Sequence, residues 1–324
     1  MRALVYDGKQ LKLEASRPMP AAGDGDVLVR VKQAGICGTD LEILRGYSNF
    51  TGIFGHEFVG VVEEAPDRKL VGKRVVGEIN CVCGRCDMCL QGLSNHCRNR
   101  TVVGIVGRAG VFADYVRLPA ANLHEVPDSV DDDAATFVEP LAAAFQAQHQ
   151  LAQKLNARSF VTVLGAGRLG LLVAQVLRNA GAPVRVVGKH AGKLQLCEKW
   201  GIKARQIGDI QLRRDQDIVV DCTGRATGLT AAMQMLRPRG TLLLKSTVAL
   251  SSAAGTTVDL SPLVVDEINV VGSRCGPFRP AIRALAEQKV DVHSMISRRV
   301  PFKDAIDAMK LAAGRDVLKV LMVM

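Results

Sequence analysis

Residues 159–181, SFVTVLGAGRLGLLVAQVLRNAG, decide the fold class of this chain. The apolar run SFVTVLG predicts a buried strand, and LGLLVAQVLRNAG, residues 169–181, predicts an amphipathic helix that ends at Gly181. A short glycine-rich turn joins the two. A strand that leads directly into a helix is the repeating unit of an α/β fold built on a parallel sheet.

The turn itself has the spacing of a phosphate-binding loop. It contains Gly165, Gly167, Leu169 and Gly170 in the order GAGRLG. Glycines at these spacings allow a tight turn, a close approach of the backbone to a pyrophosphate, and close packing of helix against strand. The free N–H groups at the start of the helix then favour an anion. A chance glycine-rich turn is the alternative, but the strand–helix context favours dinucleotide binding.

Strands and helices continue to alternate on the C-terminal side of this loop. The pattern predicts strands at PVRVVG, DIVVDCTG and GTLLLKS, and helices at KLQLCEKWG and GLTAAMQMLRPRG. Such a series predicts a doubly wound parallel sheet, covered by helices on both faces, over residues 141–275. The tail, 276–324, adds two helices, PAIRALAEQ and FKDAIDAMKLAAG, and a final strand, DVLKVLMVM.

The first 140 residues have a different character. Short β-type stretches, VLVRV, FVGVV, KRVVGEI and FADYVRL, are separated by Gly, Pro and Asp. This pattern predicts a compact, β-rich unit at residues 1–140. A chain of 324 residues is long enough for two domains, each with its own core.

The end of the second strand of the α/β region distinguishes the two nicotinamide dinucleotides. An NAD site usually has Asp or Glu there, because a carboxylate binds the ribose hydroxyls. This chain has Gly188, Lys189 and His190 instead. A 2′-phosphate would be repelled by an acid and attracted by Lys189, and the glycine leaves room for it. The residues therefore favour NADP(H) over NAD(H), with a plain polar turn as the alternative.

Two short motifs in the β-rich unit contain candidate metal ligands. Cys37 lies in GICGTD and His56 in GHE, and Glu139 follows at the domain junction in EPLA. A lone Cys or His is more often a packed core residue. Together, a thiolate, an imidazole and a carboxylate form a ligand set for zinc that leaves one position for water or substrate.

Five cysteines crowd the stretch CVCGRCDMCLQGLSNHC, residues 81–97. Four of them follow the pattern C-x2-C-x2-C-x7-C, namely Cys83, Cys86, Cys89 and Cys97. Four thiolates close together in sequence suit a tetrahedral zinc with no open position, which predicts a structural metal. Cys81 is the extra cysteine. A zinc finger that reads DNA would need a histidine pair and a basic recognition helix, which this stretch lacks.

These motifs, in this order, resemble the zinc-dependent medium-chain dehydrogenase/reductase superfamily, which includes alcohol, polyol and threonine dehydrogenases. The resemblance rests on GICGTD, GHE, the cysteine cluster, EPLA and VLGAGRLG, and it covers essentially the whole chain. It implies a GroES-like catalytic domain at 1–140, with a structural zinc lobe at about 81–97. It also implies a Rossmann domain at 141–275 and a C-terminal segment, 276–324, that completes the catalytic domain.

The resemblance also implies a reaction and its residues. Hydride would pass between an alcohol or polyol, or the matching aldehyde or ketone, and a nicotinamide cofactor, with zinc as the Lewis acid. Cys37 and His56 would bind this catalytic zinc, and the third ligand would be either Glu57 or Glu139. Thr39 matches the family's proton-passing hydroxyl. Asp40 matches the carboxylate that orients the ligand histidine.

Further positions carry roles that the resemblance alone implies. Thr223 matches the segment that lines the nicotinamide, and Ser273 to Cys275 match the stretch whose backbone holds its carboxamide. Lys319 would approach the pyrophosphate, or it is an ordinary surface lysine. Glu42 stands where many relatives have the histidine that ends the proton relay.

Composition restricts the partners. The net charge is +10, but the basic residues are scattered and only 4% of residues are aromatic, which argues against nucleic acid. A solvated basic surface, or attraction to a small anionic ligand, explains the charge. No apolar run approaches the ~18 residues that span a membrane, so we expect no membrane partner and a cytoplasmic location. Nine cysteines there would be thiols or metal ligands. The resemblance implies a homo-oligomer, either a dimer or a tetramer.

Two other functions remain open from the sequence. A zinc-free reductase of quinones or activated alkenes has the same fold, although Cys37 and His56 argue against it. The second function is that of a non-catalytic, cofactor-binding protein, in which the metals would only stabilise the structure.

Overall fold

The computed structural model describes residues 1–21, 25–248 and 257–324. The chain divides into two compact units. Unit 1 comprises Met1–Glu139 and Phe278–Met324, and unit 2 comprises Pro140–Pro277. Helix α4 (Val138–Leu151) begins in the first unit and continues into the second. Among the helices of the described ranges, none is long and apolar enough to cross a membrane.

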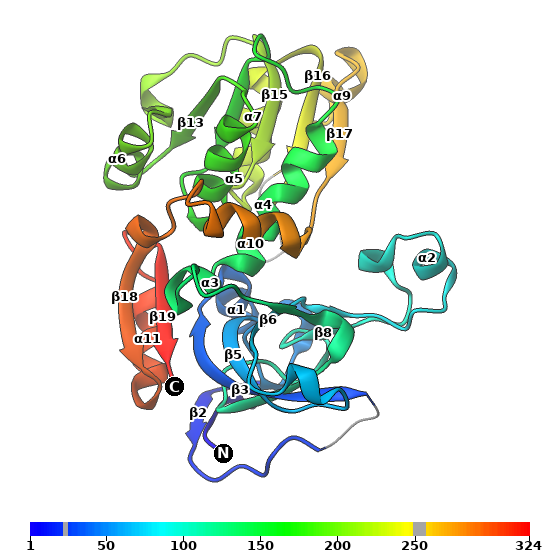
Figure 1. The fold of residues 1–324 in the computed structure, drawn as a ribbon. Helices are drawn as coiled ribbons and strands as arrows, with labels where there is room; N and C mark the ends of the chain where they lie inside the picture. The colour runs from blue at the N-terminus through cyan, green and yellow to red at the C-terminus, as the bar shows by residue number, and fades with distance from the viewer. Residues whose placement is uncertain (22–24, 249–256) are drawn as a thin grey trace. The chain divides into compact units, whose positions relative to one another are not determined.

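Unit 2 is built on a parallel sheet, drawn in green and yellow in Figure 1. Its six strands lie in the order β14 (Lys203–Gln206), β13 (Val184–Gly188), β12 (Val161–Leu164), β15 (Gln216–Asp221), β16 (Leu236–Leu244) and β17 (Asn269–Gly272). Every pairing is parallel. The order reverses between β12 and β15, and the carboxyl edge at such a reversal is where dinucleotides bind.

Helices pack on this sheet as the periodicity predicts. The predicted ones are α5 (Arg168–Asn179), α6 (Ala191–Lys199) and α7 (Ala226–Met235), whereas α9 (Ser261–Val265) was not predicted. The predicted helix GLTAAMQMLRPRG is too long, because α7 ends at Met235 and Leu236, shortly before Pro238, begins a strand. Helix α5 contacts β12 and β13, and Gly170 through Leu177 are all buried. The core between helices and sheet includes Val187, Val219 and Leu242. The predicted combination of a doubly wound parallel sheet with a β-rich domain is confirmed by this sheet together with unit 1.

Unit 1 is organised around a seven-stranded sheet. Its strands are β11 (Leu123–Glu125), β6 (Arg74–Gly77), β5 (Glu57–Glu64), β3 (Asp26–Gly35), β19 (Lys319–Val323) and β18 (Ile296–Pro301), in that order, with β10 (Tyr115–Pro119) also pairing with β3. The long strand β3 contains VLVRV, whose alternation predicts a strand, and it pairs with β5, β10 and β19. The last strand of the chain therefore lies beside one of the first.

Two smaller sheets and several short helices complete unit 1. The sheets are β2 (Leu11–Glu14), β1 (Ala3–Tyr6) and β4 (Gly52–Ile53), and β7 (Asn80–Cys81), β8 (Thr101–Val103) and β9 (Gly107–Arg108). The α-helices are α1 (Gly38–Ile43), α2 (Asp87–Leu90), α3 (Asp132–Ala135), α10 (Phe278–Ala286) and α11 (Ala305–Ala312). The core contains Phe54, Phe58 and Phe112 from the first segment, with Phe302 and Met322 from the tail.

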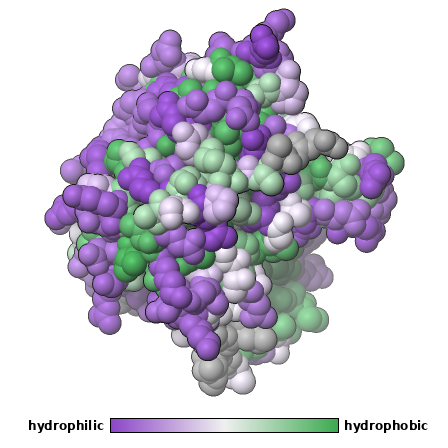
Figure 2. All heavy atoms as spheres, turned by 90° about the horizontal axis from the view of Figure 1, so that it is seen from below, coloured by the Kyte–Doolittle hydropathy of each residue, from purple (hydrophilic) through white to green (hydrophobic). Residues whose placement is uncertain are grey.

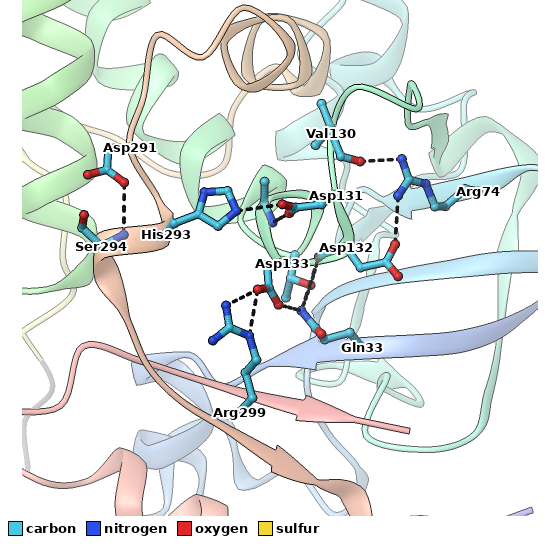
Figure 3. Close-up of polar contacts among 12 residues, drawn as sticks. Gln33, Arg74, Val130, Asp131, Asp132, Asp133, Asp291, His293, Ser294 and Arg299 are labelled. Atoms are coloured by element: carbon cyan, nitrogen blue, oxygen red, sulfur yellow. Dashed lines mark hydrogen bonds and ion pairs between the residues drawn. The ribbon is translucent and has the colours of Figure 1, made fainter.

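A polar network also attaches the tail to the first segment of unit 1 (Figure 3). Asp131 accepts a hydrogen bond from His293 Nε2 at 2.9 Å, and Asp133 accepts one from Arg299 Nε at 2.8 Å. Gln33 on β3 donates to the other oxygen of Asp133 at 3.0 Å. Because most of these groups are exposed, we regard the network as an orienting contact and assign most of the stability to the apolar core.

The segment that carries α2, residues 82–100, lacks an apolar core. Among these residues only Cys97 is buried, whereas Leu90 is 76% exposed and Leu93 is 47% exposed. Figure 2 shows apolar side chains beside polar ones on the surface of this segment, at the right of the view. Burial of apolar surface therefore contributes little to its conformation, and another interaction has to hold it together.

Gly55, directly before His56, provides a test of how the fold positions this histidine. Its φ is +88°, and a Cβ there would lie 2.5 Å from Cε1 of Phe112, a fully buried ring. Gly72 has a similar φ of +80° but open space around its Cβ position. We expect Gly72→Ala to cost about 1 kcal/mol from backbone strain alone, and Gly55→Ala to cost a further ~1–3 kcal/mol from the clash.

Urea unfolding of both variants measures the difference. Equal losses of unfolding free energy would show that the packing against Phe112 does not constrain this turn.

Candidate functional site

The four cysteines of the predicted structural zinc site lie together. The sulfur atoms of Cys83, Cys86, Cys89 and Cys97 are all within 4.8 Å of one another. Cys83 and Cys97 are 3.5 Å apart, Cys86 and Cys89 are 3.6 Å apart, and none of the four forms a disulfide. Cys81 lies outside this group, buried on β7.

The local backbone favours thiolates at this cluster. Hydrogen bonds from the amides of Arg85 and Cys86 lower the pKa of Cys83 to about 6, and backbone hydrogen bonds at Arg98 and Cys89 also lower the pKa of Cys86. Partial burial and the neighbouring sulfur atoms raise the pKa of Cys89 to about 12. Four sulfur atoms at this spacing repel one another once ionised, so the donor set fits a tetrahedral cation such as zinc.

A second group of potential ligands comes from separate elements of unit 1. Cys37, His56 and Glu57 offer ligand atoms that all lie within 4.8 Å of one another. Cys37 is half-buried at the start of α1, whereas His56 and Glu57 are buried where β5 begins. One sulfur, one imidazole and one carboxylate suit a zinc site that retains an open position.

Cys37 and His56 are both oriented by Asp40. Asp40 is fully buried, and its carboxylate accepts a hydrogen bond from the Cys37 N–H at 2.8 Å, which closes the first turn of α1. Its other oxygen lies 3.4 Å from Nδ1 of His56. A carboxylate on one ring nitrogen directs the other toward a metal, which is the arrangement that the sequence predicts for Asp40.

The electrostatics of the second group also fit a cation. Burial lowers the pKa of His56, but Asp40 and then Cys37 raise it more, so the net pKa lies well above the ordinary value. Oε1 of Glu57 is buried and accepts no hydrogen bond within the described ranges. A buried carboxylate oxygen without a donor costs free energy, and a bound cation would remove that cost.

Glu57 is held by an interaction that the sequence did not predict. Its Oε2 forms an ion pair with Nζ of Lys319, and both side chains are 1% exposed. Nζ also donates to the carbonyl of Ile36 at 3.3 Å and lies 5.5 Å from the ring centre of Phe137. The prediction of an ordinary surface lysine at 319 is therefore wrong, because β19 places it inside the sheet of unit 1.

The backbone leaves space for this pair. Gly35 on β3 lies opposite Glu57 in the register, and a Cβ at Gly35 would be 2.6 Å from Oε2 of Glu57. A larger residue at this position would displace the carboxylate. No local pattern marks Lys319 as a partner, since it is far from Glu57 in sequence.

The other predicted catalytic residues have different environments. Thr39 Oγ1 lies 3.7 Å from Sγ of Cys37. Glu42 forms an exposed ion pair with Arg45 at 2.6 Å. Glu139 lies in the first turn of α4 and is not a member of the group formed by Cys37, His56 and Glu57. Its role as an alternative zinc ligand stays a prediction.

The glycine-rich loop of unit 2 has a reason for each glycine. Gly165 has a φ of +110°, and a Cβ there would approach the backbone of Cys222 at 3.1 Å. Gly167 precedes the first turn of α5 and faces open space, whereas a Cβ at Gly170 would collide with the Gly165 carbonyl. These are the three requirements of a dinucleotide loop: a tight turn, an approachable backbone and close helix packing. Leu169 lies in the first turn of α5.

The remaining cofactor candidates lie at the carboxyl ends of the strands. Lys189 and His190 are exposed after β13, and His190 caps α6. Gly188 is buried, and a Cβ there would be 2.7 Å from that of Ala166, so the glycine is required by packing against the loop. Its second expected role, to leave room for a 2′-phosphate, stays a prediction.

Thr223, Ser273 and Cys275 occupy the other half of the same edge. Thr223 donates from its N–H and its hydroxyl to Asp221 Oδ1, at 2.9 and 2.7 Å. The Ser273 N–H donates to the carbonyl of Leu244, and Cys275 follows with a φ of +51°. These three residues therefore follow β15 and β17. They lie on the opposite side from Lys189 of the switch point, the place between β12 and β15 where the strand order reverses.

Comparison with known proteins identifies the family. Residues 23–128 match the model of the alcohol dehydrogenase GroES-like domain, and residues 169–290 match that of the zinc-binding dehydrogenase. The chain is 30% identical to the D-arabitol-phosphate dehydrogenase of Enterococcus avium over 325 residues, which covers 92% of this chain and 90% of that protein. The chain belongs to the zinc-dependent medium-chain dehydrogenase family. It is a hydride-transferring oxidoreductase of the zinc-dependent, NAD(P)-dependent alcohol and polyol dehydrogenase class.

Solved structures of this family have the same fold. A protein from Sinorhizobium meliloti 1021, described as a zinc-binding dehydrogenase bound to NADP, is 30% identical, with a TM-score of 0.87 over 100% of this chain and 99% of that one. A protein of Escherichia coli CFT073, described as a short chain alcohol dehydrogenase complexed with NADH, is 26% identical, with a TM-score of 0.89 over the same shares. Both nicotinamide cofactors therefore occur among the similar structures.

Matched cysteine substitutions distinguish the two metal groups. We expect wild type to hold two zinc ions per chain, one for each group. Cys37→Ser should lose one ion and reduce kcat by about 10³-fold or more, because a Lewis acid contributes several kcal/mol to the barrier. Cys89→Ser should lose the other ion and lower the melting temperature, because binding at a structural site contributes folding free energy.

Elemental analysis, turnover and thermal unfolding of both variants provide the measurements. Two ions and full turnover in Cys37→Ser would contradict the catalytic assignment, and an unchanged melting curve in Cys89→Ser would contradict the structural one.

Lys319→Met tests the buried ion pair. Removal of one partner leaves the Glu57 carboxylate buried and uncompensated, so we expect a loss of about 3–5 kcal/mol of unfolding free energy. The double variant Glu57→Gln with Lys319→Met should recover part of that loss. Lys310→Met, which breaks an exposed pair with Asp307, is the control and should cost less than about 1 kcal/mol.

Chemical denaturation at constant zinc content gives these values. If Lys319→Met loses no more unfolding free energy than Lys310→Met, the pair between Glu57 and Lys319 does not stabilise the fold.

Proposed function

We propose that this protein is an NADP(H)-preferring dehydrogenase that interconverts polyols, or other small secondary alcohols, and their carbonyl forms. The observation that carries the proposal is the group formed by Cys37, His56 and Glu57, whose ligand atoms lie within 4.8 Å of one another. These residues would hold the catalytic zinc, which supplies a Lewis acid for the substrate oxygen when bound. Cys83, Cys86, Cys89 and Cys97 would hold a second, structural zinc.

The protein's own residues prepare the proton path. The Asp40 carboxylate faces Nδ1 of the His56 ring at 3.4 Å, and the pair with Lys319 holds the Glu57 side chain in its buried position. The hydroxyl of Thr39, close to Cys37, would accept the proton of the substrate alcohol and pass it outward. Glu42 pairs with Arg45 on the exposed side of α1, so the next acceptor after Thr39 is water or this exposed carboxylate.

The preference for NADP(H) rests on the end of β13. Lys189 and His190 are exposed there, and a carboxylate that would bind the ribose hydroxyls is missing from Gly188 to His190. A 2′-phosphate is stabilised by a nearby cation. The NADP-bound relative from Sinorhizobium meliloti supports this reading, while the NADH-bound one from Escherichia coli shows that the fold accommodates either cofactor.

A polyol substrate is proposed from the family relationship. The Enterococcus avium relative is named for D-arabitol phosphate, and a sugar alcohol is a secondary alcohol of the kind that this zinc chemistry oxidises. A substrate panel should therefore contain C4 to C6 polyols, their phosphates, simple secondary alcohols and the corresponding ketones.

We further propose a homo-oligomer that forms through unit 2. β17 is the last strand of its sheet, and Val264, Val265 and Val270 near this edge are 80%, 78% and 45% exposed. An exposed strand edge with apolar neighbours favours pairing with a second copy. Sedimentation that shows only monomer at micromolar concentration would contradict this.

Thiolate zinc sites suit a reducing compartment, which supports a cytoplasmic location that cell fractionation can check.

The decisive experiment measures kcat/KM for this panel with NADP and with NAD. We expect turnover of at least one polyol class, with NADP preferred. Lys189→Glu should reverse the preference by about 100-fold, because it replaces an attractive charge beside the 2′-phosphate with a repulsive one. Lys199→Glu makes the same charge change on the exposed last turn of α6 and should leave the preference unchanged.

Three results would contradict the proposal. Dinucleotide binding without turnover of any panel member would indicate a non-catalytic protein. Turnover only of quinones or activated alkenes, with a single zinc per chain, would indicate the zinc-free reductase. An equal change of cofactor preference in Lys189→Glu and Lys199→Glu would remove the role of Lys189.

A further inference from the structure

A lysine is buried at the carboxyl edge of the unit 2 sheet. Lys245 directly follows β16 and is only 7% exposed. Its backbone N–H donates to the carbonyl of Asp221 at 2.9 Å, and its Nζ donates to Oγ of Ser273 at 3.1 Å. An ammonium group loses hydration free energy when it is buried, and hydrogen bonds such as the one to Ser273 offset part of that loss.

The position of Lys245 relates it to one half of the proposed cofactor site. In a doubly wound sheet the dinucleotide crosses the switch point, with one nucleotide on each side of the strand reversal. The Gly165 loop marks the pyrophosphate, and Lys189 after β13 marks the adenosine half. We therefore expect the second nucleotide, which carries the nicotinamide, to lie at the carboxyl ends of β15, β16 and β17. Lys245 and its acceptor Ser273 lie at two of these ends.

The positive charge acts on its neighbours at this edge. Burial raises the pKa of the Cys222 thiol, Asp221 raises it further, and Lys245 opposes both. Cys222 is the residue whose backbone faces Gly165 across the turn. The Lys245 ammonium therefore acts on Cys222, beside the glycine loop, in opposition to the Asp221 carboxylate, and removal of the lysine would leave the carboxylate unopposed there.

We propose that Lys245 biases the bound cofactor toward its reduced form. The oxidised nicotinamide ring carries one positive charge. The reduced ring is neutral, because hydride transfer brings two electrons and one proton from the alcohol carbon while the hydroxyl proton leaves to solvent. A fixed cation on the same side of the switch point therefore weakens binding of the oxidised form relative to the reduced form. This inference rests on the proposed dinucleotide site, and it makes Lys245 a positioning residue for the redox equilibrium.

The test is the ratio of the dissociation constants of the oxidised and the reduced cofactor, Kd(NADP⁺)/Kd(NADPH), measured by calorimetry. We expect Lys245→Met and Lys245→Gln to lower this ratio about tenfold, the scale of one unit charge in a partly shielded site. For a two-electron couple, tenfold corresponds to about 30 mV in the potential of the bound cofactor. Lys245→Arg keeps the charge and should keep the ratio.

Two controls separate charge from structure. Lys154→Met removes another lysine of unit 2, whose Nζ donates at 2.8 Å to Oγ1 of Thr241, four residues before Lys245, and should leave the ratio unchanged. Lys245→Gln retains a donor for Ser273 and serves as the neutral variant if Lys245→Met does not fold, as judged by thermal unfolding.

The outcomes are distinct. An unchanged ratio in the folded neutral variants overturns the inference, and so does an equal shift in Lys245→Arg, which would mark a packing effect. Failure of wild type to bind either form would instead contradict the proposed cofactor site. If wild type binds only NAD(H), the same comparison is made with NAD⁺ and NADH.

Discussion

The ion pair between Glu57 and Lys319 is the interaction on which the catalytic unit depends. Both side chains are 1% exposed, and they connect the start of β5 to the start of β19 across β3. Desolvation of two charges is costly, and good geometry with additional acceptors such as the Ile36 carbonyl offsets that cost. Because Lys319 belongs to the last strand, the ligand set near Cys37 is complete only after the two ends of the chain have come together.

The two metal-binding groups differ in what holds them before a metal binds. Cys37, His56 and Glu57 lie in a packed sheet and beside the buried side chains of Asp40 and Lys319, which help to position them. The four clustered cysteines lie in a segment with almost no buried apolar surface, so the proposed structural zinc would be the main source of its stability. This contrast agrees with the proposed roles, reversible ligand exchange at the first group and closed coordination at the second.

Basic residues lie on both sides of the switch point of the unit 2 sheet, but they are exposed on one side and buried on the other. Lys189 and His190 are exposed after β13, where they face solvent and a prospective phosphate. Lys245 is buried after β16, where a charge acts over a longer range because screening is weak. The excess of basic residues in the composition thus has a local counterpart at a site for an anionic cofactor, although most of that excess is spread over the surface.

The sequence alone determined every feature that a short stretch encodes: the glycine loop, the clustered cysteines, the strands such as VLVRV and the helix at 169–181. It did not predict α4, whose mostly apolar, Ala-rich sequence contains a proline in its first turn and shows no single hydrophobic face, nor β14, β17 and β18, which are short and partly polar. Only the tertiary structure decided that Glu57 lies beside Cys37 and His56, that Lys319 is its partner, and that Lys245 is buried beside Ser273. The physical reason is that these contacts join residues far apart in the chain. The free energy of these contacts comes from burial and from charge interactions in the folded structure. Such contacts produce no periodic pattern in the sequence.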